Sequence, residues 1–214
     1  MMNEIYDEHY FTWQQTIGEF GGIANQFKFG SHIKPADTVL DFGCGGGYLL
    51  KNLNCARRVG LEVNPTAAQR ARENGIECHK TLDTIADSSI DVVISNHALE
   101  HVPDPFQTLA ALRAKLIPNG WLVIVVPCEA NITPYNCEDI NHHLYTWNPQ
   151  ILGNLAREVG YTVEQVIPIF HKWPRRFLDV QKTFGWNLFH LIARLYGRYK
   201  RLDFQVKLVA RNPE

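Results

Sequence analysis

The chain of 214 residues is 45% hydrophobic, 11% aromatic and 20% charged, with a formal net charge of -1. This composition excludes a wholly disordered chain, because enough apolar surface is available to offset the conformational entropy lost on folding. A near-neutral charge also argues against a protein that binds nucleic acid over its whole surface. The longest apolar runs, such as Trp121 to Val126, are far shorter than the roughly 20 residues of a membrane-spanning helix.

The N-terminus and the cysteines point to a cytoplasmic protein. Acidic residues stand among the first eight positions, where a signal peptide would have a basic and then an apolar segment. The cysteines are odd in number and contain no C-x-x-C pair, which disfavours a disulfide framework or a zinc ribbon. We therefore expect reduced thiols at Cys44, Cys55, Cys78, Cys128 and Cys137.

Strand-like and helix-like segments alternate from residue 38 onward. Buried strands are predicted, in chain order, at residues 38–42, 57–62, 76–79, 91–95, 121–126 and 161–169. Helices are predicted between them at residues 46–53, 65–74, 103–116 and 148–159. A last alternating segment, 204–210, fits a strand that runs antiparallel at the end of the sheet. This rhythm predicts an α/β fold, a mostly parallel sheet with helices on both faces.

The whole chain, 1–214, is predicted to form one domain with two additions. An aromatic helical cap covers about residues 1–34, and its rings could close over a bound ligand or simply pack on the domain edge. A basic amphipathic insertion covers about residues 171–201, between the last two strands.

A glycine-rich loop follows the first predicted strand. Asp41 ends that strand, and Gly43, Gly45 and Gly47 follow at alternate positions. Glycines let the backbone turn sharply and approach a ligand closely. A dinucleotide fingerprint would need a small residue where Tyr48 stands, which disfavours an oxidoreductase. A carboxylate at the loop suits a zwitterionic amino-acid tail with a sulfonium centre. Glu62, at the end of the second strand, can accept hydrogen bonds from ribose hydroxyls.

These residues, together with the run from Asp91 to Pro105, resemble the class I S-adenosylmethionine-dependent methyltransferases over about residues 38–170. The likeness is greatest to the branch of ubiquinone-biosynthesis O-methyltransferases and of small-molecule and glycan methyltransferases. It implies a Rossmann-like sheet of seven strands, the last antiparallel, with S-adenosylmethionine bound over the carboxyl ends of the first strands.

The resemblance also implies a set of cofactor-binding residues. Asp41, Gly43 and Gly45, with Cys44 between them, would hold the methionine part, and Glu62 would hold the ribose. Val63 and Leu82 would flank the adenine, and Asn96 and His97 would lie beside the sulfonium.

Histidines are the candidates for a general base, because imidazole titrates near neutral pH. We select His142, His101 and His143 as catalytic candidates, with His142 preferred. No metal site is predicted. The competing hypothesis is a divalent ion on Glu100 and His101 with a later histidine, since some relatives carry a Glu-x-x-Glu-His cluster. Here His97 replaces the first Glu of that cluster, which removes one hard oxygen ligand.

The insertion 171–201 holds eight Lys or Arg and one acid, Asp179, a formal +7; the rest of the chain is a formal -8. Apolar residues recur at helical spacing within it. It either covers the sheet or the acceptor pocket, or it contacts an anionic membrane at the inner face. Nucleic acid is a weaker alternative, because no RNA-reading motif is present.

The predicted function is therefore methyl transfer from S-adenosylmethionine to an oxygen or nitrogen of a small-molecule, sugar or lipid-linked acceptor. The alternative classes are a noncatalytic binding or scaffold protein with the same fold and, less favoured, a dinucleotide-dependent oxidoreductase.

Overall fold

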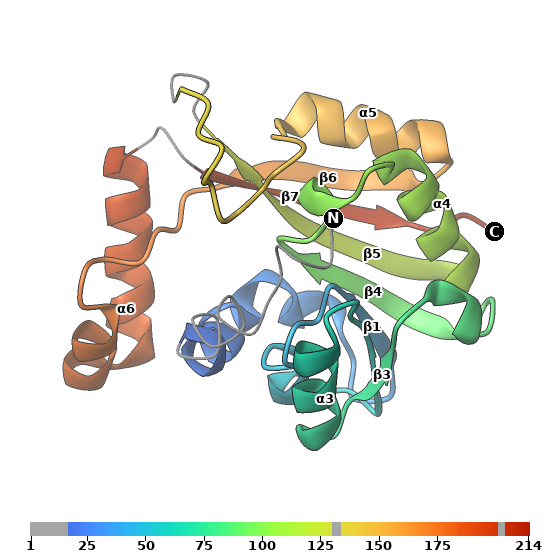
Figure 1. Ribbon diagram of the computed structural model, residues 1–214, viewed down its shortest axis with the longest axis horizontal. Coiled ribbons are helices and arrows are strands. Elements are labelled where there is room, and N and C mark those ends of the chain that lie inside the picture. Colours follow the sequence, from blue (N-terminus) through green and yellow to red (C-terminus); the bar gives the residue numbers. More distant parts are fainter. Residues whose placement is uncertain (1–16, 130–133, 201–203) are drawn as a thin grey trace.

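A computed structural model describes residues 17–129, 134–200 and 204–214 (Figure 1). Its centre is a sheet of seven strands in the order β3-β2-β1-β4-β5-β7-β6. The aromatic residues Tyr6, His9, Tyr10, Phe11 and Trp13 of the predicted cap lie outside the described residues. The strands are β1 Thr38–Phe42, β2 Arg57–Leu61, β3 Glu77–His79, β4 Ile90–Asn96, β5 Leu116–Cys128, β6 Thr162–Ile169 and β7 Phe204–Arg211.

Strand pairing confirms the predicted sheet type and corrects one detail. The first five strands pair in parallel, and β7 is antiparallel to both β5 and β6. The prediction that the last strand ends the sheet was wrong: β7 lies between β5 and β6, so β6 forms the edge. Local sequence could not show this, because the order of strands is set by long-range packing.

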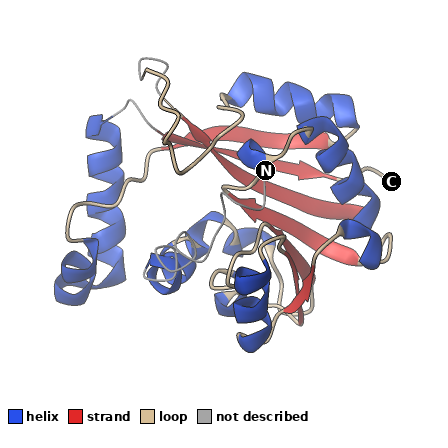
Figure 2. Cartoon of the chain, in the orientation of Figure 1, coloured by secondary structure: helices blue, strands red, loops and turns tan. Residues whose placement is uncertain are grey.

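Alternating side chains along the strands divide the core into two clusters, one on each face of the sheet. Leu40, Val93 and Leu122 belong to one cluster, which also contains residues of the helices α4 Pro105–Lys115 and α5 Pro149–Val159. Their neighbours Val39 and Val92 belong to the other, which contains the segments around Phe29 and Leu50. Figure 2 shows the resulting layers of helices about the sheet.

Three helices begin at the same two-residue signal. They are α3 Pro65–Glu73, α4 Pro105–Lys115 and α5 Pro149–Val159. In each, the side chain of the preceding Asn or Asp accepts a backbone N–H of the first turn, and proline occupies the first helical position, where no N–H is needed. Gly160, at φ 100°, ends α5 in the left-handed conformation.

The predicted helix at residues 46–53 was wrong. Only a short 3₁₀ turn, η3 Leu50–Asn52, is present there. Gly45 and Gly47 have φ of 54° and 73°, a left-handed backbone that cannot continue into an α-helix from residue 46. Residues 43–49, between β1 and η3, therefore form an irregular loop and not the start of a helix.

The N-terminal part and the insertion pack together at one side of the domain. Residues 17–24 are helical and precede η1 Gln26–Lys28 and η2 Gly30–His32. The insertion forms α6 Phe177–Lys200, interrupted at Gly185 by a non-helical backbone. Figure 1 shows α6 standing apart from the sheet. Phe20 joins the two parts, with ring centroids of Trp173, Phe177, Trp186 and Phe189 at 5.0, 4.7, 5.1 and 5.2 Å.

Two further expectations concern the thiols and the membrane. All five cysteines are free, and Cys44 and Cys55 are buried. Within the described residues, no helix has both the length and the apolar character needed to cross a membrane.

Candidate active site

A cavity of about 490 Å³ lies at the carboxyl ends of β1, β2 and β4. In open α/β sheets this edge is the usual place for ligands. Eight of the nine predicted cofactor residues line the cavity, and Leu82 does not. Leu82 begins the 3₁₀ turn η4 Leu82–Thr84 and packs against the core cluster beside α4.

The glycine loop forms the floor of the cavity. A Cβ built on Gly45 would meet no atom within 4 Å, so this position faces open space in the cavity wall. A Cβ on Gly43 would lie 2.4 Å from the Cβ of Ala98. Gly45 thus leaves room for a ligand, and Gly43 allows the loop to approach the segment after β4.

Glu62 ties this loop to the end of β2. Its two carboxylate oxygens accept the backbone N–H groups of Gly45 and Asn64, each at 2.8 Å. Burial raises the pKa of the Glu62 carboxyl, although these N–H groups and that of Val63 act in the opposite direction.

Asp41 is buried, and its Oδ1 atom has no hydrogen-bond partner among the described residues. Burial, and then the charge of Glu62, raise the pKa of the Asp41 carboxyl well above its usual value. Two desolvated carboxyl groups at one cavity favour a ligand that brings positive charge and hydroxyl donors. The amino group, sulfonium and ribose of S-adenosylmethionine provide these groups, so the residues present fit this cofactor.

Of the three catalytic candidates, only His101 lines the cavity. The ring of His143, in the loop after β5, contacts the ring of His101, with ring centroids 4.9 Å apart. His142 is exposed, with φ 47°, and its backbone hydrogen bonds to the His101 ring. The structure thus brings His101 and His143 together and leaves the His142 side chain outside the cavity lining.

Glu100 is the centre of this cluster. It belongs to the 3₁₀ turn η5 Leu99–His101, is fully buried, and neither carboxylate oxygen has a hydrogen-bond partner among the described residues. Its Oε1 atom lies 3.4 Å from His97 Nδ1, 3.9 Å from His101 Nε2 and 4.0 Å from His143 Nε2. Such a carboxylate can stabilise positive charge that develops on a neighbouring imidazole.

Burial lowers the pKa of the His101 imidazole, and the nearby Glu100 partly opposes this shift. His101 therefore remains neutral, and able to accept a proton, at pH values where an ordinary histidine is already partly protonated. At neutral pH this imidazole is therefore in the form that a general base needs, although the lower pKa also makes it a weaker base.

The same cluster also has ligand atoms suited to a metal ion. One atom each from Glu100, His101 and His143 lie within 4.8 Å of one another. Glu129 Oε1 lies 2.9 Å from His143 Nδ1 and orients that ring, as carboxylates do for metal-bound histidines. Two imidazoles and one carboxylate suit a first-row transition metal better than magnesium.

Sequence reasoning missed one wall of the cavity. This wall is lined by Ile17, Gly18, Gly21 and Gly22 of the N-terminal helix, by Asn25 just after it, and by Trp173 of the insertion. The sequence predicted a cap over about residues 1–34 that could close over a ligand. It did not indicate that the glycines of this segment would face the cavity.

Sequence reasoning also missed Lys28. Its buried Nζ donates a hydrogen bond of 3.0 Å to Asn96 Oδ1, at the cavity end of β4. Burial lowers the pKa of Lys28 to about 7. This lysine therefore positions the side chain of a predicted cofactor residue.

Lys28→Met is expected to raise the free energy of unfolding at pH 6, by on the order of a few kcal/mol. Between pH 7 and 10.5 the unfolded wild-type chain binds more protons than the folded one, so wild-type stability rises with pH. The gain from Lys28→Met should therefore shrink toward pH 10. Thermal unfolding of both proteins, with exposed Lys34→Met as the control, measures this. An equal gain at both pH values would contradict the buried charge.

Comparison with known proteins identifies the family of this chain. The profile of a methyltransferase-domain family matches residues 11–166. The chain is 30% identical over 156 residues to the ubiquinone biosynthesis O-methyltransferase of Nitrosospira multiformis, covering 60% of this chain and 64% of that protein. It is 30% identical over 149 residues to a probable S-adenosylmethionine-dependent methyltransferase of Mycolicibacterium smegmatis, covering 66% and 58%.

Among solved structures, a possible histamine N-methyltransferase from Thermotoga maritima superposes with a TM-score of 0.69 over 99% of this chain and 100% of that one, at 14% identity. At this identity the likeness shows the fold alone.

The fold and the site define a Rossmann-like cofactor-binding domain. The chain belongs to the class I S-adenosylmethionine-dependent methyltransferase family. It spans less than two thirds of the length of the two curated relatives described above.

Proposed function

We propose that this protein transfers a methyl group from S-adenosylmethionine to an oxygen or nitrogen atom of a small-molecule, sugar or lipid-linked acceptor. The observation that carries the proposal is that a buried carboxyl group, Asp41, and a half-buried one, Glu62, line the same cavity as His101. The relative from Nitrosospira multiformis is named for O-methylation, which supports an oxygen acceptor.

The cofactor supplies a methyl group already activated on a sulfonium. Asp41 and the glycine loop would hold its amino-acid part, Glu62 its ribose and Val63 its adenine. Asn96, oriented by Lys28, and His97 would line the reacting end. Because the methyl carbon is activated, the protein chiefly has to align the acceptor and exclude water.

His101 would remove the proton of an acceptor hydroxyl or amine. Its ring lines the cavity, its lowered pKa keeps it neutral near pH 7, and Glu100 would stabilise the imidazolium that forms. A metal ion on Glu100, His101 and His143 is the second arrangement that the cluster supports, and there the ion would lower the pKa of the acceptor hydroxyl.

Isothermal titration tests the cofactor assignment. S-adenosylmethionine and S-adenosylhomocysteine should bind, and NAD should not. Glu62→Ala should weaken both sulfur ligands by about 1.5–3 kcal/mol, since it removes hydrogen bonds to a charged group. The exposed Glu158→Ala, on α5, is the control. Binding of NAD without a response to either sulfur ligand would refute the proposal.

A further inference from the structure

The part of α6 after Gly185 uses one face to join the domain. Phe189, Ala193 and Gly197 are buried at intervals of four residues. Phe189 and Ala193 pack with Phe20 in one cluster, and a Cβ on Gly197 would lie 2.8 Å from the backbone nitrogen of His171. This face is therefore already occupied by the fold.

The opposite face of α6 is apolar, and none of the residues that the structure describes covers it. Leu188, Leu191, Leu195 and Tyr199 follow one another at spacings of three or four residues, so they form a single stripe along the helix. They are 38%, 50%, 56% and 82% exposed, and Phe184, just before the break, is 54% exposed. Scattered exposed leucines are ordinary, but a continuous stripe on a helix whose other face is buried marks a contact surface.

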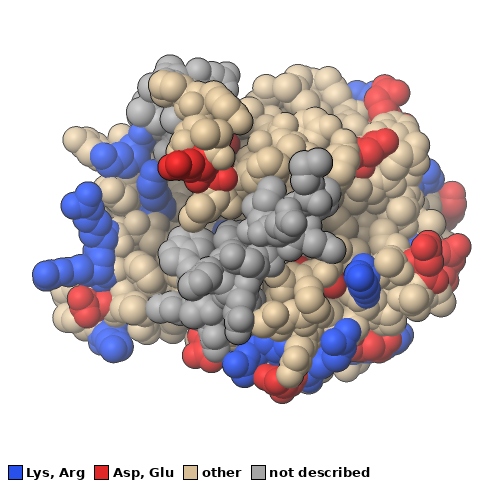
Figure 3. All heavy atoms as spheres, viewed as in Figure 1, with Lys and Arg blue, Asp and Glu red and all other residues tan. Residues whose placement is uncertain are grey.

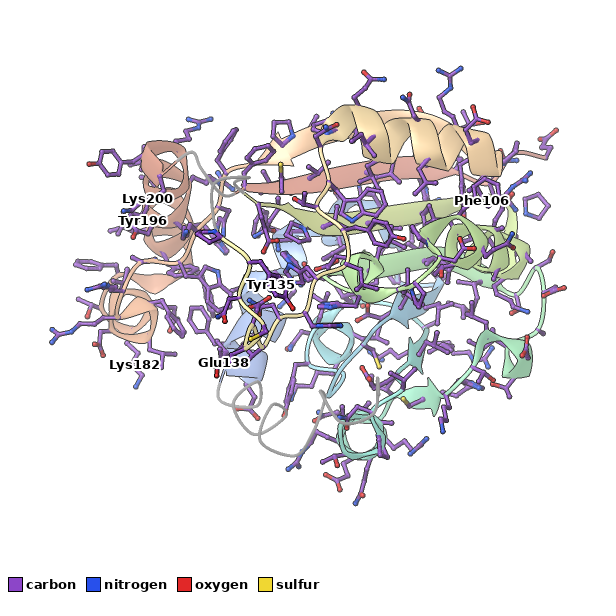
Figure 4. The ribbon with its side chains drawn as sticks, turned by 45° about the horizontal axis from the view of Figure 1, so that its top comes forward. Phe106, Tyr135, Glu138, Lys182, Tyr196 and Lys200 are labelled. Atoms are coloured by element: carbon purple, nitrogen blue, oxygen red, sulfur yellow. The ribbon has the colours of Figure 1, made fainter. Side chains whose placement is uncertain are left out.

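Positive charge lies on the same segment as this stripe. Arg194 and Arg198 are exposed on the helix, with the Arg194 guanidinium 5.9 Å from the ring centroid of Phe27, and residues 171–201 carry a formal +7 with Asp179 as their one acid. Figure 3 shows Lys and Arg gathered over α6, and Figure 4 shows Lys182, Tyr196 and Lys200 at the same side of the molecule. A self-complementary contact between two copies would bring these like charges together, which disfavours a dimer through this face.

We propose that α6 docks on an anionic lipid bilayer, with the stripe from Leu188 to Tyr199 in the interface and the cations on lipid headgroups. Apolar burial combined with several cations is what reversible binding of an interfacial helix requires. The helix lies on the membrane surface in this arrangement, in keeping with the lack of a spanning helix among the described residues.

The docking face is connected to the cavity. Phe20, which packs against the buried face of α6, belongs to the same short helix as Gly18, Gly21 and Gly22 of the cavity wall. Trp173 also lines the cavity and lies 5.0 Å from the ring of Phe20. If the proposed function holds, docking brings the cavity wall toward the bilayer, which suits a lipid-linked acceptor.

Vesicle flotation tests the docking without cofactor or acceptor. The full chain should bind vesicles of phosphatidylcholine with phosphatidylglycerol much more tightly than vesicles of phosphatidylcholine alone. Binding should weaken between about 0.05 M and about 0.5 M salt, because the Debye length shortens. Arg194→Gln with Arg198→Gln should weaken binding to the anionic vesicles about 30-fold, since each cation near such a surface contributes about 1 kcal/mol. Leu191→Gln with Leu195→Gln should weaken it about tenfold or more at both salt concentrations.

Matched variants elsewhere control for charge and for apolar area. Lys80→Gln with Arg157→Gln removes two exposed cations. Phe106→Gln with Ile151→Gln removes two apolar side chains that are 41% and 51% exposed, and Figure 4 shows Phe106 far from α6. Both controls should bind vesicles like the wild type, and all variants should keep wild-type affinity for S-adenosylmethionine.

Three results would overturn the docking proposal. The first is equal binding to neutral and anionic vesicles, and the second is unchanged binding in both α6 variants. The third is a wild-type dimer in sedimentation velocity that Leu191→Gln with Leu195→Gln abolishes, because the stripe would then belong to a second copy. None of these results depends on methyl transfer, so failure of the docking and failure of the proposed function are distinguishable.

Discussion

Asp41→Asn is expected to weaken S-adenosylmethionine binding about 10- to 100-fold while making the unliganded protein more stable. The loss of affinity corresponds to one hydrogen bond between charged groups, about 1.5–3 kcal/mol. The gain in stability arises because the variant no longer carries a buried carboxyl group whose pKa folding raises, and that shift costs stability at every pH above the ordinary pKa.

The pH dependence of both effects follows from the raised pKa of Asp41. Above the ordinary pKa of 3.8 and up to the raised value, the folded protein binds more protons than the unfolded chain, so this group makes stability fall as pH rises. The advantage of Asp41→Asn in thermal unfolding should therefore grow with pH. Wild-type affinity for the cationic cofactor should instead rise with pH, because binding favours the ionised carboxyl.

Titration calorimetry and thermal unfolding at pH 5 to 9 measure these trends. Asp83→Asn makes the same change in charge at an exposed position of η4 and should alter neither quantity appreciably. Wild-type affinity in Asp41→Asn would show that this carboxyl does not face the cofactor.

The sequence predicted the features that depend on neighbouring residues, namely where the helices begin and which strand ends meet. The Asx-Pro pairs before α3, α4 and α5 combine a side-chain cap with a fixed φ, so these helices begin where expected. Asp41 and Glu62 end neighbouring parallel strands, and the carboxyl ends of such strands meet at one edge of the sheet. The cavity there could therefore be predicted without coordinates.

Long-range contacts and single dihedral angles could not be predicted in the same way. Lys28 meets Asn96 across 68 positions of sequence, and no periodic pattern links them. The adjacent histidines 142 and 143 have equal chemistry, but the backbone between them leaves one ring exposed and turns the other toward Glu100. Loop geometry decides which of two neighbouring imidazoles faces a site, and this geometry cannot be predicted from the residue types.

Glu100→Gln is expected to reduce kcat about 100-fold or more while leaving S-adenosylmethionine affinity within a few fold. The variant keeps the size of the side chain but removes the charge that would stabilise protonated His101, and this stabilisation belongs to the transition state. His101→Ala should lose at least as much. Glu129→Gln, which alters a half-exposed partner of His143, should have a much smaller effect if His101 is the base.

The pH profile separates this role from a purely structural one. Activity requires neutral His101, so kcat/KM should fall as pH drops through the lowered pKa of that imidazole. Since Glu100 raises this pKa against the effect of burial, Glu100→Gln should move the acid limb to still lower pH. An unshifted acid limb in Glu100→Gln would argue against the pairing.

Two further comparisons decide between the alternatives for the same cluster. His142→Ala should retain most activity, because its side chain lies outside the cavity lining, and a loss equal to that of His101→Ala would reassign the base. Removal of metal by a chelator should leave activity unchanged if His101 acts alone. If activity disappears with the chelator and returns with zinc or manganese, Glu100, His101 and His143 bind a metal ion. A large loss of activity in Glu129→Gln would then show that Glu129 orients one of the ligands, His143.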